Sequence, residues 1–211
     1  MVAEAERTTE LDRIIFFSDG VFAIAITLLV IGLRVPALPS HVSNSELSRR
    51  LLDEWPRVLS YTVSFAVIGL YWIGHHRAFA HIRRFDHRLI LLNLTFLGLI
   101  AFLPFPTAVI GRYGGHRAAV VLYAGSLALA GLASTALWLY AWQAKLADVG
   151  PRRARYLAAR AAIPVAVFAV SIPIAFLSPA AAKLSWLSFL IVRRMVDNYY
   201  RGAGADEGAF A

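Results

Sequence analysis

Residues 13–33 read RIIFFSDGVFAIAITLLVIGL, and this run decides the fold class. From Ile14 to Leu33 the only ionisable side chain is that of Asp19. A helix of this length spans roughly 30 Å, the thickness of the hydrocarbon core of a bilayer. The run therefore predicts a transmembrane helix at 14–33. A carboxylate inside such a helix is costly, so Asp19 is a candidate functional residue that needs a partner.

The composition of the whole chain agrees with a membrane protein. Of its 211 residues, 59% are hydrophobic and 16% are charged, whereas soluble domains have about 45–50% and about 25%. The sequence contains no cysteine, which excludes disulfides and thiolate chemistry. The net charge of +8 is explained by basic residues in cytoplasmic loops, so we expect no nucleic-acid partner.

Further apolar runs, separated by Gly, Pro and charged residues, predict an all-α polytopic protein with six transmembrane helices. The other five spans are expected at 57–79, 88–110, 118–142, 156–177 and 180–196, and a short surface helix at 45–55. We expect three regions: a cytoplasmic leader at 1–13, a six-helix channel domain at 14–196 and a disordered cytoplasmic tail at 197–211.

The distribution of basic residues predicts the orientation of these spans. Six crossings place both termini on one side of the membrane. Fourteen of the 21 Lys and Arg residues fall on that side and seven on the other. Because cytoplasmic loops carry the excess of basic residues, both termini are expected in the cytoplasm.

Several polar side chains are expected at one depth near the cytoplasmic face. Three spans supply them: Ser18 and Asp19; Trp72, His75 and His76; and Asn93. Buried polar groups in lipid need partners, and an imidazole or an amide is a suitable donor to Asp19, with Arg13 as a cap from the interface. The cluster has two interpretations, a structural clamp that holds three helices or a gating or proton-sensing device.

The same residues give little support to a metal site or an enzyme. His75, His76, His81 and His87 do not recur at i,i+3 or i,i+4 spacing. The sequence has no P-loop and no pair of catalytic carboxylates, and Ser18 has no placed base that would make it a nucleophile.

Two stripes run along the first span. Gly20, Ala23 and Thr27 form a stripe of small residues that lets another helix approach closely. An adjacent aliphatic stripe consists of Ile24, Leu28 and Ile31. Spacing alone fits lipid contact or ordinary packing. Alternatively, copies of this helix meet on a symmetry axis, and the aliphatic stripe lines a narrow pore that gates by dewetting.

An ordered set of motifs in about the first 110 residues resembles a known family. The motifs are R-x-x-x-F-S-D at 13–19, W-x-x-H-H-R-x-F at 72–79, L-N-L-x-F at 92–96 and F-L-P-F-P-T at 102–107. Together they resemble the signature of the endosomal and lysosomal potassium channel family, the transmembrane protein 175 family. The last three spans resemble the family only in hydropathy and length.

The resemblance implies a bacterial member with a single six-helix repeat, which assembles as a homotetramer in the inner membrane. It implies a potassium-permeable pore lined by four copies of the first helix. Because a ring of isoleucines offers an ion no ligands, we expect only a modest preference for potassium over sodium, and we expect no cofactor or resident metal. Ile24 would form the constriction, Leu28 and Ile31 the next layers, and Thr27 a contribution to selectivity. The signature polar network would comprise Arg13, Phe17, Ser18, Asp19, Trp72, His75, His76 and Asn93.

Two other functions remain open on the sequence alone. The first is a proton-linked secondary transporter that uses Asp19, His75 and His76, although the inverted repeat typical of such proteins is not found in the sequence. The second is a membrane scaffold without a pore.

Overall fold

The computed structural model describes residues 2–35, 37 and 41–202, with side chains from Glu10 onward, and this part of the chain is almost entirely helical. The elements that make up the bundle's long spans are α1 (Val2–Leu28), which a 3-10 turn η1 (Leu29–Gly32) extends, α3 (Trp55–Phe79), α4 (His87–Phe102) with α5 (Pro104–Tyr113), α6 (Arg117–Gln143) and α7 (Pro151–Leu177). The other helices are α2 (Asn44–Asp53), α8 (Pro179–Ser185) and α9 (Ser188–Gly202).

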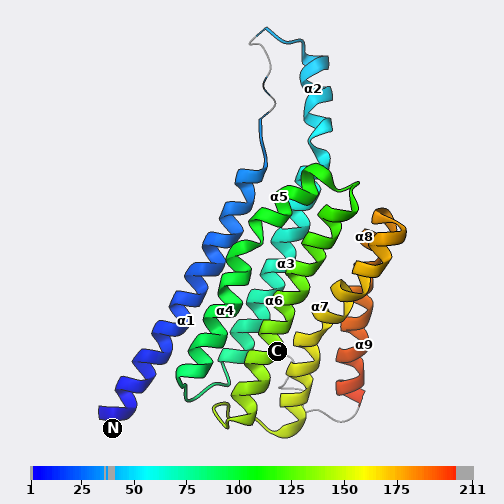
Figure 1. Ribbon diagram of the computed structural model, residues 1–211. Coiled ribbons are helices and arrows are strands. Elements are labelled where there is room, and N and C mark those ends of the chain that lie inside the picture. The colour runs from blue at the N-terminus through cyan, green and yellow to red at the C-terminus, as the bar shows by residue number, and fades with distance from the viewer. Residues whose placement is uncertain (1, 36, 38–40, 203–211) are drawn as a thin grey trace.

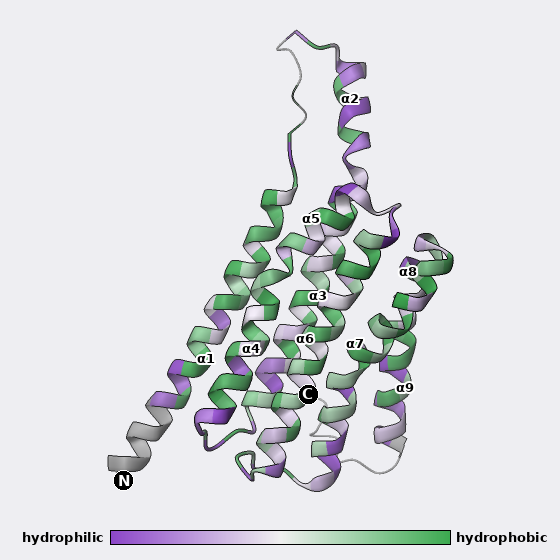
Figure 2. Cartoon of the chain, in the orientation of Figure 1, coloured by the Kyte–Doolittle hydropathy of each residue, from purple (hydrophilic) through white to green (hydrophobic). Residues whose placement is uncertain are grey.

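Five of the six predicted spans correspond to helices long and apolar enough to cross a membrane. They are Glu10–Gly32, Trp55–Phe79, His87–Tyr113, Arg117–Gln143 and Pro151–Leu177. Figure 2 shows hydrophobic residues along most of their length. The predicted surface helix is α2, which projects beyond the bundle and begins where Ser43 Oγ accepts a hydrogen bond from the Glu46 backbone N–H at 3.3 Å.

The third span is interrupted at one point. Helix α4 ends at Phe102 and α5 begins at Pro104. Proline has no backbone N–H and its ring crowds the preceding turn, so the helical ladder is broken there. The sequence places prolines near the end of this span, and the structure places the break at Leu103.

The sixth predicted span, 180–196, differs most from the structure. Two helices, α8 and α9, occupy it, with the turn at Trp186 and Leu187. Helix α9 also continues to Gly202, into the segment predicted as a disordered tail at 197–211. The reason is that Asp197 is anchored to α7, since it accepts a hydrogen bond from Tyr156 Oη at 3.0 Å and lies 3.6 Å from Arg160 Nη1. Residues 203–211 lie outside the described residues.

The predicted leader is part of the first helix. Helix α1 begins at Val2 and runs through the whole of 1–13 except Met1, which lies outside the described residues.

In Figure 1, α1 begins and α9 ends at the same end of the bundle, while α2 lies at the opposite end. Helix α1 forms one edge of the bundle, and α7, α8 and α9 form the other.

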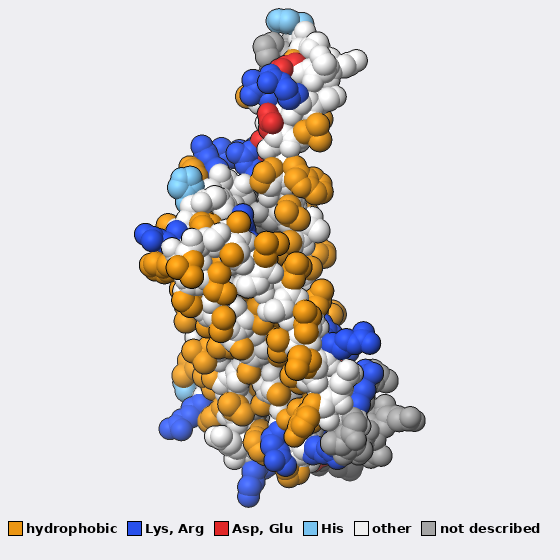
Figure 3. Space-filling model, turned by 90° about the vertical axis from the view of Figure 1, so that its right-hand side faces the viewer, with side chains coloured by type: hydrophobic (Ala, Val, Ile, Leu, Met, Phe, Trp, Pro, Cys, Tyr) orange, Lys and Arg blue, Asp and Glu red, His pale blue; other side chains and the backbone are white. Residues whose placement is uncertain are grey.

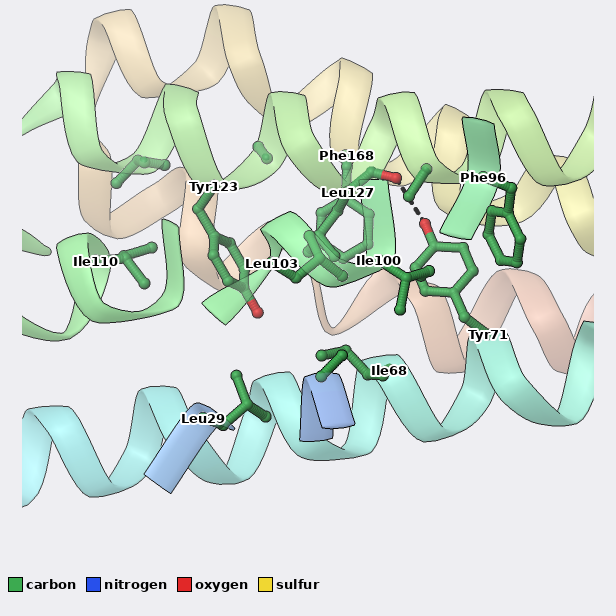
Figure 4. Packing of buried hydrophobic residues seen from close by; sticks show 14 of the residues in the cluster. Leu29, Ile68, Tyr71, Phe96, Ile100, Leu103, Ile110, Tyr123, Leu127 and Phe168 are labelled. Atoms are coloured by element: carbon green, nitrogen blue, oxygen red, sulfur yellow. Dashed lines mark hydrogen bonds between the residues drawn. The ribbon is translucent and has the colours of Figure 1, made fainter. Parts of the chain in front are cut away.

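The core lies between α3, α4, α6 and α7, with α1 packed on its side. Figure 4 shows Tyr71 of α3 reaching across to α6, where its hydroxyl donates to the Leu127 carbonyl oxygen at 2.6 Å. Helices α6 and α7 pack closely because Gly131 has no side chain. A Cβ at that position would lie 3.0 Å from Val165 Cγ2 and 3.2 Å from Pro164 Cβ.

Candidate functional site

Helix α1 has a buried face and an exposed face. Ser18, Phe22, Ala25 and Leu29, at i, i+4, i+7 and i+11, are all buried. On the other side, the exposed fractions of Ile24, Leu28 and Ile31 are 60%, 41% and 68%. Such contrast is expected of a helix that packs on its own bundle with one stripe and presents the other to something outside the chain.

The exposed stripe is longer than the sequence indicated. Arg13 and Phe17 precede Ile24 at helical spacing and are exposed as well. Arg13 makes no hydrogen bond or ion pair with the described residues, so the predicted cap on the polar cluster is not formed within the chain. Arg13 and Phe17 therefore belong to the exposed stripe and not to the buried hydrogen bonds.

The small-residue stripe lies on the exposed side too. Gly20, Ala23 and Thr27 are exposed, and nothing lies within 4 Å of the position that a Gly20 Cβ would occupy. No helix among the described residues uses this stripe for close approach. The Thr27 hydroxyl donates to the Ile24 carbonyl oxygen at 2.9 Å, which leaves the hydroxyl oxygen free to accept.

A chain of hydrogen bonds joins three helices beneath this stripe. Asn93 Nδ2 of α4 donates to Ser18 Oγ of α1 at 3.0 Å, and Ser18 Oγ in turn donates to the Ile14 carbonyl oxygen at 2.8 Å. Asn93 Oδ1 lies 2.9 Å from His75 Nε2 of α3. An amide oxygen only accepts, so His75 carries its proton on Nε2 in this arrangement.

His75 is enclosed by aromatic rings. Its imidazole stacks on Phe79 at 4.2 Å between centroids and on Phe96 at 5.7 Å, and Phe22 lies at 5.7 Å in a tilted orientation. His75, Asn93 and Ser18 are all buried. Aromatic surroundings and a satisfied hydrogen bond hold the ring in one orientation, which suits a structural joint between α1, α3 and α4.

Asp19 has a different partner from the one expected. Its Oδ1 accepts from the indole Nε1–H of Trp72 at 2.8 Å, not from an imidazole or an amide. The Trp72 ring stacks on His76, with centroids 5.5 Å apart. Trp72 and His76 are exposed and Asp19 is half-buried. The structure thus divides the predicted network into a buried chain, Ser18–Asn93–His75, and a more exposed one, Asp19–Trp72–His76.

A second buried polar group joins α3, α5 and α6, and the sequence analysis did not identify it. Thr107 Oγ1 donates to Ser64 Oγ at 2.8 Å, and Ser64 Oγ lies 2.9 Å from the Tyr123 hydroxyl. These residues are spread over three spans with no shared spacing, so no local pattern indicates them.

The described residues hold no group of three His, Cys, Asp or Glu side chains that could serve as metal ligands.

Comparison with known proteins decides the family. Residues 13–104 match the family model described as endosomal/lysosomal potassium channel TMEM175. A potassium channel of Chamaesiphon minutus is 41% identical over 143 residues, which cover 66% of this chain and 70% of that protein. The chain belongs to the TMEM175 family. The resemblance found in the sequence is therefore confirmed.

Other members of the TMEM175 family show how far the similarity reaches. A potassium channel of Streptomyces collinus is 42% identical over 134 residues, 61% of this chain and 63% of that protein. The human protein, named endosomal/lysosomal proton channel TMEM175, is 37% identical over 98 residues, which are 44% of this chain and 19% of that protein.

Solved structures extend the TMEM175 likeness to the rest of the fold. The crystal structure of a lysosomal potassium-selective channel TMEM175 homolog from Chamaesiphon minutus superposes with a TM-score of 0.77 and 31% identity, covering 89% of this chain and 98% of the other. The crystal structure of a variant of the potassium channel MtTMEM175, at 19% identity and a TM-score of 0.64, shows the shared fold alone. TMEM175 proteins are channels, a class distinct from enzymes.

Proposed function

We propose that this chain forms a potassium-permeable channel in the bacterial inner membrane. Four copies assemble around an axis, and the exposed stripe of α1 from each copy lines the pore. Two bacterial relatives are named potassium channels, and the shared fold covers 98% of the Chamaesiphon minutus structure. The partners are potassium ions in transit, the bilayer and the other copies of the chain.

The observation that carries this proposal is the exposed stripe of α1. A lipid-facing helix needs only apolar side chains, yet beside this stripe the exposed side of α1 carries the small residue Gly20 and the hydroxyl of Thr27. Small residues on an exposed face favour close helix approach in membranes. Because no described helix of the chain uses Gly20, α1 of another copy is the natural partner.

The chemistry of the stripe suggests how ions pass. Ile24, Leu28 and Ile31 provide no oxygen ligands, so an ion must keep much of its hydration in the constriction. Rings of aliphatic side chains control conduction by wetting and dewetting. Discrimination by size of a partly hydrated ion is weak, which accounts for only a modest preference for potassium over sodium. Thr27, one residue before Leu28, offers a hydroxyl oxygen to that ion or its water.

Six crossings complete the proposed topology, with both termini in the cytoplasm. Helix α9 would supply the sixth crossing together with α8, after the turn at Trp186. Its arginines, Arg193, Arg194 and Arg201, would then lie toward the cytoplasmic face with the other basic residues, in keeping with the positive-inside rule.

A cysteine introduced into the stripe tests the pore directly, because the natural chain has none. In Ile31→Cys, a hydrophilic thiol reagent added outside should block potassium flux through liposomes containing the protein. Leu129→Cys is the matched control, since Leu129 of α6 is 54% exposed but lies off the stripe. Modification of Ile31→Cys that leaves flux unchanged would contradict the proposal.

Proton conduction is a second candidate, because the animal relatives are named proton channels. The same liposomes loaded with a pH-sensitive dye distinguish the two functions. Potassium flux without a coupled pH change supports the potassium channel. Passive acidification in the absence of potassium supports a proton channel, and uptake of a solute against its gradient would support the proton-linked transporter.

A further inference from the structure

A cavity of about 390 Å³ lies between α3, α6, α7 and α9, away from the exposed stripe of α1. It opens to the surface, since its lining includes the exposed residues His76 and Arg77. This volume falls within the range of small-molecule binding sites, about 300–1,000 Å³. Figure 3 views the side of the molecule where α8 and α9 lie, with apolar side chains over a broad middle band and Lys and Arg toward the ends.

The lining of the cavity divides into an apolar part and a basic part. The apolar part includes Leu70, Leu157 and Phe168. The basic part comes from three helices and consists of Arg77, Arg153, Arg160 and Arg193, with His76 and His81 beside them. None of the described lining residues is an Asp or a Glu.

The positive charge of the basic part is only partly compensated, because one carboxylate, that of Asp197, faces both Arg160 and Arg193. Arg160 is 3.6 Å from Asp197 and donates to Tyr156 Oη at 2.8 Å. Among the described residues, no ion pair joins Arg77, Arg153 or Arg193 to a carboxylate. Like charges gathered around one opening are unfavourable by themselves, and an anion placed between them relieves the repulsion.

Two of the arginines lie near the ends of helices long enough to cross a membrane, which is the level at which lipid headgroups are expected. Arg77 is near the end of α3, which ends at Phe79, and Arg153 is near the start of α7, which begins at Pro151. The apolar lining continues from these ends toward the middle of the same helices. A ligand that fits both parts has a phosphate at one end and a hydrocarbon chain at the other.

We propose that this cavity binds an anionic phospholipid of the surrounding leaflet. Its phosphate lies among Arg77, Arg153 and Arg193, and part of one acyl chain enters the apolar cavity. Basic pockets between transmembrane helices at the headgroup level are the sites where anionic lipids bind. Because α9 is at the opposite edge of the bundle from α1, this site does not depend on whether α1 lines a pore.

Native mass spectrometry of delipidated full-length protein tests this proposal. The protein is titrated with phosphatidylglycerol and with phosphatidylcholine of the same acyl chains. Wild type should bind phosphatidylglycerol more tightly. Arg77→Gln combined with Arg193→Gln should weaken that binding about 30-fold, given the electrostatic attraction of each basic residue to anionic lipid. The corresponding double lysine variant, which keeps both charges, should retain most of it.

Two controls separate this site from general attraction to a basic surface. Arg83→Gln combined with Arg88→Gln removes two exposed charges outside the cavity, and phosphatidylglycerol binding should change little. Ala161→Phe fills the cavity and keeps all four arginines, so it should abolish lipid retention while the protein remains folded.

Three results would overturn the lipid site. The first is equal binding of the two lipids by wild type, a result that holds even if a substituted protein fails to fold. The second is an equal loss of phosphatidylglycerol binding in the Arg77/Arg193 double variant and in the Arg83/Arg88 double variant. That result would mean that the lipid is attracted only by the overall surface charge. Displacement of the lipid by soluble glycerol phosphate would make the site one for a free anion, with no role for the acyl chain.

Discussion

The side-chain amide nitrogen of Asn93 lies 3.0 Å from Ser18 Oγ, and this hydrogen bond ties α1 to α4. The same amide holds His75 of α3 through its oxygen. Helix α1 lies at the edge of the bundle, so these contacts fix its rotation about its own axis. The rotation decides which residues are exposed, and Asn93 thereby sets the position of the Ile24 stripe without belonging to it.

Asn93→Ala should destabilise the protein. The substitution leaves the buried Nε2–H of His75 without its acceptor and removes the donor to Ser18. A buried polar group without a partner costs about 1–3 kcal/mol. We expect a lower temperature of unfolding in detergent. Asn198→Ala, at an exposed position of α9, is the control and should have little effect; equal stability of the two variants would contradict this role.

Trp72→Phe tests the hydrogen bond to Asp19. The change keeps an aromatic ring beside His76 but removes the indole N–H that Asp19 accepts from. We expect a loss of about 1 kcal/mol, because the Asp19 carboxyl loses its hydrogen-bond donor at a partly exposed position. Trp186→Phe is the matched comparison. Its buried Nε1 has no partner among the described residues, so thermal unfolding should show a smaller loss than in Trp72→Phe.

Gly131→Ala should disturb the contact between α6 and α7. The new Cβ would lie 3.0 Å from Val165 Cγ2 and 3.2 Å from Tyr71 Oη, and such overpacking costs about 1–3 kcal/mol. Gly125→Ala on the same helix meets nothing within 4 Å. Unfolding temperatures should fall for the first variant and not for the second. If the unfolding temperature fell equally in both variants, the cause would be the replacement of glycine itself and not a clash between α6 and α7.

The thermal stability of the protein should depend on pH through Asp86, which lies between α3 and α4. Hydrogen bonds from the Tyr140 hydroxyl and the Leu89 backbone N–H hold the pKa of this carboxyl below its ordinary value of 3.8. The lowered pKa means that the stabilisation is present above pH 3.8 and is lost as the pH falls through the folded-state pKa. Wild type should exceed Asp86→Asn in thermal stability at neutral pH, and the difference should shrink below pH 3.8. A difference independent of pH would contradict the charged role of Asp86.

Much of the helical frame follows from hydropathy, and the exceptions have local causes. The apolar run at 14–33 and the similar runs after it predict six spans, and five of them correspond to candidate membrane spans in the structure. Residues 180–196 have the composition of a span, yet they form two helices. Ser178 caps the start of α8 at Pro179, and a turn at Trp186 and Leu187 separates α8 from α9. Hydropathy summed over a window is insensitive to such a turn.

The site was predictable where helical spacing or depth determines it. Depth alone indicated that Ser18, His75 and Asn93 share a layer, and the structure joins them by hydrogen bonds. The partner of Asp19 was not predictable in this way, since the choice between the Trp72 indole and a nearby imidazole depends on the rotation of α3. That rotation is set by packing between helices far apart in the sequence.

The most direct test of the pore is potassium flux into liposomes containing wild type or Ile24→Asn, with potassium and sodium gradients in turn. Asparagine at the constriction should favour water there, so the variant should carry more potassium and discriminate less against sodium. Leu129→Asn, exposed to a similar extent on α6, should behave as wild type. Unchanged flux and selectivity in Ile24→Asn, with tetramers intact on size-exclusion chromatography, would contradict a pore lined by this face of α1.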